Sequence, residues 1–98
     1  MVRLRYTRLA LADLGEAEAF VRAHNPAAAA SMMRHIETAI DRLQTFPESG
    51  RRGRVAGTRE LVVPETPLIV AYRLTRSTID ILSIVHAARR WPSGFSER

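Results

Sequence analysis

The chain contains no cysteine and no lysine among its 98 residues. Without cysteine it can form no disulfide framework, no thiolate nucleophile and no zinc site built on thiolates. Its fifteen basic residues are all arginines, whose guanidinium groups bind phosphate or carboxylate well but are poor general bases at neutral pH. The formal net charge of +5 therefore favours acidic partners such as nucleic acid, a ribosome or an acidic protein.

Long apolar runs are also missing. Charged residues from Arg3 to Asp13 interrupt the N-terminal segment, which excludes the continuous apolar stretch of a signal peptide. The run from Leu68 to Tyr72 is far shorter than the ~20 residues that cross a bilayer. We therefore expect a soluble, cytoplasmic protein without a membrane segment, folded as one domain over residues 1–98. A chain of this length builds a modest core, so a partner that covers apolar surface would stabilise it.

The first half of the chain predicts one strand and two helices. Residues 2–7 alternate apolar with polar side chains, as in a strand with one buried face. Apolar side chains then recur at helical spacing from Arg8 to about His24 and from Pro26 to about Thr45. Asn25 and Pro26 form a start signal for the second helix, since asparagine caps free amides and proline lacks the amide that would be left unpaired. The short link predicts an antiparallel helical hairpin.

The second half predicts a loop and three strands. The loop covers residues 48–57, and strand-like segments follow over Thr58–Val63, Leu68–Leu74 and Thr78 to about Ala87. Short turns between consecutive strands predict antiparallel pairing. The resulting order, βααβββ, predicts an α+β fold in which an antiparallel sheet packs on the N-terminal helical hairpin.

The last strand carries apolar side chains on both faces, which indicates a central place in the sheet. Strict alternation would put Val85 on the same face as Ile79 and Ile81, and Ile84 on the opposite face. One face must meet the helices. The other face needs a cover from elsewhere.

Other chemistries lack their signatures. The segment GRRGR has no Gly-Lys-Ser/Thr, so a phosphate-binding P-loop is not indicated. His24, His35 and His86 do not have metal-ligand spacing. Ser83 and His86 would point to opposite faces of one strand, which argues against a serine triad. We expect no metal and no cofactor.

A set of basic residues remains as the candidate target-binding surface. It lies in the glycine-rich loop, on the strands that follow and at the end of the last strand, and it includes one aromatic side chain that could stack on a base or a guanidinium group. The set consists of Arg51, Arg52, Arg54, Arg73, Arg89, Arg90 and Trp91. The alternative is a solvated rim of arginines around an apolar sheet, with His86 as an ordinary residue at a strand end.

Three segments, taken in their order behind two helices, resemble the ParE/RelE family of bacterial type II toxins. They are Gly57-Thr58-Arg59-Glu60-Leu61, Ile69-Val70-Ala71-Tyr72-Arg73 and Ile84-Val85-His86-Ala87-Ala88-Arg89. The resemblance implies a RelE/ParE-like fold and a growth-arresting toxin. ParE-type members poison DNA gyrase, and RelE-type members cut messenger RNA in the ribosomal A site. Both kinds imply a cognate antitoxin, usually small and acidic, that forms a hetero-oligomer with the toxin.

The resemblance also allows the two types to be compared. RelE-type members carry basic catalytic residues on strands that align with Glu60, Val62 and Ile69 here, and these are acidic or apolar. The chain is therefore closer to the ParE side, with gyrase as the expected target. If it is instead a ribonuclease, Arg59, His86 and Arg90 are the residues left to supply the chemistry. A non-toxic basic interaction module is a third possibility, for which no antitoxin gene would lie beside this one.

Overall fold

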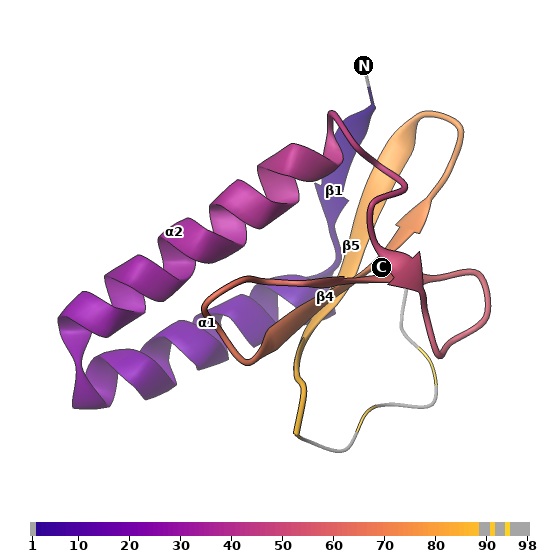
Figure 1. Cartoon of the computed structure of the whole chain (residues 1–98). Helices are drawn as coiled ribbons and strands as arrows, with labels where there is room; N and C mark the ends of the chain where they lie inside the picture. Colours follow the sequence, from indigo (N-terminus) through magenta and orange to yellow (C-terminus); the bar gives the residue numbers. More distant parts are fainter. Residues whose placement is uncertain (1, 89–90, 92–93, 95–98) are drawn as a thin grey trace.

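The computed structural model describes residues 2–88, 91 and 94. In chain order the elements are β1 (Arg3–Tyr6), α1 (Arg8–His24), α2 (Pro26–Leu43), β2 (Arg51–Arg52), β3 (Arg59–Val62), β4 (Leu68–Leu74) and β5 (Thr78–His86). Figure 1 shows the two helices side by side on one side of the sheet. This confirms the predicted α+β fold with a helical hairpin packed on a sheet. In this part of the chain neither helix is long and apolar enough to cross a bilayer.

Local capping sets the boundaries of the helical hairpin. The Thr7 hydroxyl accepts a hydrogen bond from the Ala10 amide, and the Asn25 side chain accepts one from the Ala28 amide. Asn25 has an extended backbone, so it ends α1 and caps α2 at the same residue. The second helix ends at Leu43, two residues before the predicted Thr45, because the amides that follow bond back to Asp41 and Arg42 in a tighter turn.

The sheet has the strand order β1-β5-β4-β3-β2. Strands β2 to β5 pair antiparallel with their neighbours, as predicted, whereas β1 pairs parallel with β5. The sheet is therefore mixed. Short turns predict antiparallel pairing only for strands that are adjacent in the sequence. Strands β1 and β5 are separated by all the other elements. The two-residue β2 was not predicted and lies in the segment expected to be loop.

The core lies between the helices and the facing side of the sheet. Helix α2 contributes Ile36, Ile40 and Leu43, and the central strands contribute residues such as Val70 and Tyr72, all buried. On the other side of the sheet Ile69, Ala71 and Val85 are each less than a tenth exposed. The outer face thus has an apolar centre that is already shielded from water.

A bulge in β5 changes which residues face the helices. Ala71 lies opposite Ser83 and Tyr72 lies opposite Ile81, so Leu82 has no partner across the ladder. Beyond this point Ile84, rather than Val85, joins Ile79 and Ile81 in the core. The alternation expected from the sequence was therefore wrong after Ile81.

The N-terminal part of the chain holds the bulge in place. The Thr7 hydroxyl donates to the Leu82 carbonyl at 2.9 Å. The Asp13 carboxylate accepts hydrogen bonds from the Ser83 hydroxyl at 2.6 Å and from the Ile84 amide at 2.9 Å. Polar groups that the ladder leaves open are thus satisfied from α1 and its cap, which makes the irregular strand stable.

Candidate functional site

A row of three residues crosses the outer face of the sheet. Arg51 of β2 lies opposite Glu60 of β3, and Glu60 lies opposite Ala71 of β4. Ala71 stands between Val70 and Tyr72, which both belong to the helix-facing core, so successive side chains alternate and the row lies outside. The predicted target-binding residue Arg51 is therefore beside an acidic side chain.

Glu60 is the middle residue of this row. Its side chain is only 4% exposed. One carboxylate oxygen, Oε1, accepts hydrogen bonds from Nε and Nη2 of Arg51 at 3.3 and 3.1 Å. The other, Oε2, accepts from the backbone amide of Arg54 at 2.9 Å and from its Nε at 3.3 Å. Burial alone would raise the pKa of Glu60, but the Arg54 amide and the two guanidinium groups together lower it.

The charge of Glu60 is therefore compensated within the fold. The side chains of Arg51 and Arg54 remain 56% and 49% exposed, so they cover the carboxylate and still present their outer edges to solvent. Glu60 thus organises the two arginines around it.

Trp91 joins the same cluster from the C-terminal end of the chain. The guanidinium carbon of Arg54 lies 3.5 Å from the centroid of the Trp91 ring, which is a close cation–π contact. The indole Nε1 is buried and has no hydrogen-bond partner among the described residues. The structure thus brings together three of the predicted residues, Arg51, Arg54 and Trp91.

A second carboxylate lies on the outer face near the opposite edge of the sheet. Asp80 of β5 lies opposite Arg73 of β4 and next to Arg5 of β1. Nε and Nη2 of Arg5 donate to its two oxygens at 2.8 and 3.0 Å. The Arg5 hydrogen bonds lower the pKa of Asp80, and the charges of Arg5 and Arg73 act in the same direction. Arg73, predicted to bind the target, is thus on the outer face within the field of a carboxylate.

Arg52 and Arg59 lie on a different surface. They line a cleft of about 620 Å³ together with Glu48 and the glycine turn around Gly57. Nη1 of Arg59 donates to the carbonyl oxygens of Glu48 and Gly50 at 3.1 and 2.8 Å. Arg59 therefore holds the loop before β2 in place. Arg52 is exposed at the mouth of this cleft.

His86 ends β5, and its ring closes the turn that follows. Its Nδ1 accepts a hydrogen bond from the Ala88 amide at 3.1 Å, which requires that nitrogen to be unprotonated. This contact matches the alternative in which His86 is an ordinary residue at a strand end.

The residues named for a ribonuclease are not gathered by the structure. Arg59 lies opposite Tyr72, whereas His86 lies opposite Leu68 at the other end of β4. Four residues along a strand span roughly 13 Å, so these two side chains are far beyond proton-transfer reach of a shared atom. Arg90, the third residue of that set, and Arg89 lie outside the described residues.

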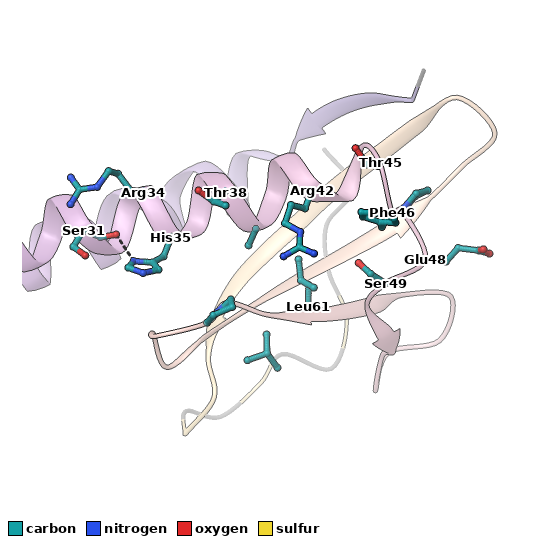
Figure 2. Close-up of a pocket in the computed structure, with 14 residues that line it drawn as sticks. Ser31, Arg34, His35, Thr38, Arg42, Thr45, Phe46, Glu48, Ser49 and Leu61 are labelled. Atoms are coloured by element: carbon teal, nitrogen blue, oxygen red, sulfur yellow. Dashed lines mark hydrogen bonds between the residues drawn. The ribbon is translucent and has the colours of Figure 1, made fainter.

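A groove that was not predicted from the sequence runs between α2 and β3. Its volume is about 1070 Å³, and its apolar lining includes Ala39, Leu61, Val62 and Phe46. Phe46 and Val62 are more than half exposed. Figure 2 shows the side chain of Arg42 extending from α2 toward Leu61 on β3. An exposed apolar floor of this size is typical of a site that another molecule covers.

The titratable side chains along the groove are mainly basic. Arg34, His35 and Arg42 come from α2, and Glu48 is the only acidic residue among the described lining residues. The loop that closes one end is fixed by Tyr72, whose buried hydroxyl donates to the Pro47 carbonyl at 2.8 Å and accepts from the Gly50 amide at 2.9 Å. A Cβ on Gly50 would come within 2.6 Å of that hydroxyl, so glycine is required there.

One sequence signal could have revealed this groove. On α2 the spacing of Ser31, His35, Thr38 and Arg42 follows one side of a helix, and this side neighbours the apolar stripe. Short hydroxyl side chains at such positions leave space between a helix and the sheet beside it.

Comparison with known proteins gives one consistent family. Residues 4–91 match the family described as ParE toxin of type II toxin-antitoxin system, parDE. A candidate toxin of Sinorhizobium fredii, Y4kP, is 43% identical over 90 residues, which cover 92% of this chain and 93% of that protein. Toxin RelE2 of Caulobacter vibrioides is 37% identical over 89 residues, which cover 91% of this chain and 99% of that toxin.

A solved structure agrees with these sequence relatives. A chain of the chromosomal ParDE toxin–antitoxin system from P. aeruginosa superimposes with a TM-score of 0.80 and 28% identity. The superposition covers 88% of the present chain and 96% of that chain. The helical hairpin and sheet described above are therefore shared with a ParDE component over nearly their full extent.

Proposed function

Because the chain belongs to the ParE family of toxins from type II toxin–antitoxin systems, we propose that it arrests growth by poisoning DNA gyrase. In this proposal a small acidic antitoxin neutralises it. The observation that favours gyrase over messenger RNA as the target is the environment of the Glu60 side chain. An RNA-cleaving site needs a cation where this residue stands, and the chain instead has a buried carboxylate bound to Arg51 and Arg54.

Two further features weigh against RNA cleavage. Ile69, at another position where the nuclease type carries a basic residue, is 5% exposed and apolar. Arg59 is bound to backbone carbonyls of its own loop, and His86 bonds to Ala88 at the far end of the sheet. Stabilising a phosphorane requires donors that converge within about 3 Å of the same oxygens. Ribosome-dependent cleavage is the alternative, and the name of the RelE2 relative is the observation in its favour.

The surface we assign to the target is the basic outer face. Among the described residues it consists of Arg51, Arg54, Arg73 and Trp91, and Arg89 and Arg90 complete the proposed set; Arg52 lies at the separate cleft beside Arg59. Guanidinium groups and an indole ring bind proteins as readily as nucleic acids, since Arg and Trp are enriched at the energetic centres of interfaces. A protein target therefore fits this surface.

The α2–β3 groove is the surface we assign to the antitoxin. Arg34 and Arg42 are eight residues apart on α2, or about 12 Å along the helix axis. They flank the apolar floor formed by Leu61 and Phe46. An amphipathic segment with apolar anchors and acidic residues on either side matches this arrangement in shape and charge.

Pulse labelling tests the proposed target. The chain is induced in bacteria without its antitoxin, and incorporation of thymidine and methionine is followed over the first minutes. We expect thymidine incorporation to fall first, because a poisoned gyrase blocks replication. An earlier fall in methionine incorporation would favour ribosomal mRNA cleavage instead. Unchanged incorporation of both, with no growth arrest, would favour a non-toxic interaction module.

A further inference from the structure

The cluster on the outer face connects two parts of the chain that are distant in sequence. Arg51 and Arg54 precede β3, Glu60 lies on β3, and Trp91 follows β5. Glu60 bonds both the amide and the Nε of Arg54, so it fixes the backbone and the side chain of that residue together. The Arg54 guanidinium in turn lies 3.5 Å from the centre of the Trp91 ring.

The indole of Trp91 has little else among the described residues to hold it by polar contact. Its buried Nε1 has no partner in that part of the structure. The attraction that the structure shows for the ring is the contact with the Arg54 guanidinium, which requires the cation to lie over the face of the ring. The position of Trp91 therefore depends on Arg54 being held in one orientation.

We propose that Glu60 is a positioning residue: its buried carboxylate orients Arg54, and Arg54 clamps Trp91 onto the outer face of the sheet. The clamp fixes the Trp91 ring next to the loop that carries Arg54. This inference rests on the proposed function only where it predicts toxicity, since the target surface includes Trp91. The clamp itself can be measured without any target.

The chain offers a direct probe, because Trp91 is its only tryptophan. Intrinsic fluorescence of the purified full-length protein therefore reports on this one side chain. Glu60→Gln removes the charge that orients Arg54, and Arg54→Lys keeps the ion pair but loses the flat guanidinium group that covers the ring. Both arginines around Glu60 are about half exposed, so they can be rehydrated and we expect both variants to fold.

Asp80→Asn is the matched control. It also removes an outer-face carboxylate that is bound by an arginine, but no described contact links it to Trp91. Circular dichroism and capture by the antitoxin check that each variant is folded.

We expect Glu60→Gln and Arg54→Lys to shift the emission of Trp91 to longer wavelength and to make its quenching by acrylamide severalfold stronger, whereas Asp80→Asn leaves both unchanged. Folded variants whose Trp91 emission and quenching match the wild type would overturn the clamp. If the emission shifts and growth arrest is lost as well, both the clamp and the target surface are supported. If the emission shifts while growth arrest persists, the clamp stands and the assignment of Trp91 to the target surface falls.

Discussion

At the scale of single residues, the most informative feature is how the chain uses its acidic side chains. Glu60 and Asp80 are 4% and 13% exposed, and each is bound by arginines that remain about half exposed or more. Burying a carboxylate costs free energy unless charged partners and hydrogen bonds offset it. The arginines that meet this need, Arg5, Arg51 and Arg54, are therefore partly structural.

These two carboxylates give the protein a defined dependence on pH. Arginine contacts lower the pKa of Asp80 below its ordinary value of 3.8, and the contacts of Glu60 lower its pKa below 4.5 despite burial. The unfolded chain then binds more protons than the folded one as the pH drops. The stabilisation is fully present above the ordinary pKa values and is lost as the pH falls through the lower folded values.

We expect the free energy of unfolding, measured with urea, to decrease from about pH 5 downward. Glu60→Gln and Asp80→Asn should each flatten this decrease. Glu18→Gln serves as the control, since Glu18 forms only an exposed pair with Arg22 on α1, and such pairs contribute little. A wild-type profile that stays flat to pH 3, or a Glu60→Gln profile as steep as the wild type, would contradict the assigned pKa shifts.

The sequence could predict which arginines lie near the sheet, but not which of them are bound within the fold and which could bind a target. Arg51, Arg54, Arg73 and Trp91 were all correctly expected near the sheet and its loop. The pairing of Arg54 with Trp91 could not be predicted from the sequence, because 36 residues separate them. They meet only once the three intervening strands have folded into the sheet. The role of Arg59 was likewise hidden, since its hydrogen bonds go to backbone carbonyls, which no sequence pattern marks.

At the scale of elements, features set by local chemistry were predictable. Thr7 and Asn25 determine where α1 and α2 begin, and both predicted starts are confirmed. The range Leu68–Leu74 for β4 was also correct, because turn residues bound it on both sides. The bulge at Leu82 and the short β2 were missed, since each depends on hydrogen bonds from other parts of the fold.

The groove between α2 and β3 supports a prediction at this scale. If an acidic amphipathic antitoxin segment binds there, replacing both Arg34 and Arg42 by glutamate should weaken toxin–antitoxin affinity by roughly tenfold or more, which is ~1.4 kcal/mol or more. Toxicity of the free protein should persist, because the groove lies away from the proposed target surface. Calorimetry with the purified antitoxin measures the first effect and growth arrest measures the second.

The control for this experiment replaces both Arg8 and Arg22 by glutamate, which changes the charge equally, because both residues are exposed on α1 and neither is among the described lining residues of the groove. It should change affinity by less than the groove variant, since remote charges are screened in salt. Equal losses in both variants would mean that net charge, rather than the groove, governs antitoxin binding. Unchanged affinity in the groove variant would show that the antitoxin does not bind at this groove.

At the scale of the whole molecule, a single helix–sheet fold presents two surfaces of different character. The helical hairpin covers one face of the sheet (Figure 1), and its second helix forms the groove at the edge of β3. The basic cluster around Glu60 lies on the opposite face. Under the proposed function, the antitoxin binds the groove and the target binds the basic face, so the two partners use separate surfaces.

An assay with purified components tests whether the outer basic face poisons gyrase. DNA gyrase, plasmid and ATP are mixed with the purified chain, and detergent and protease then trap any cleaved DNA as linear plasmid. We predict that linear plasmid accumulates with the wild-type chain, that Trp91→Ala greatly reduces it, and that added antitoxin abolishes it. Absence of linear plasmid, together with cleavage of messenger RNA on purified ribosomes by the same preparation, would contradict gyrase poisoning.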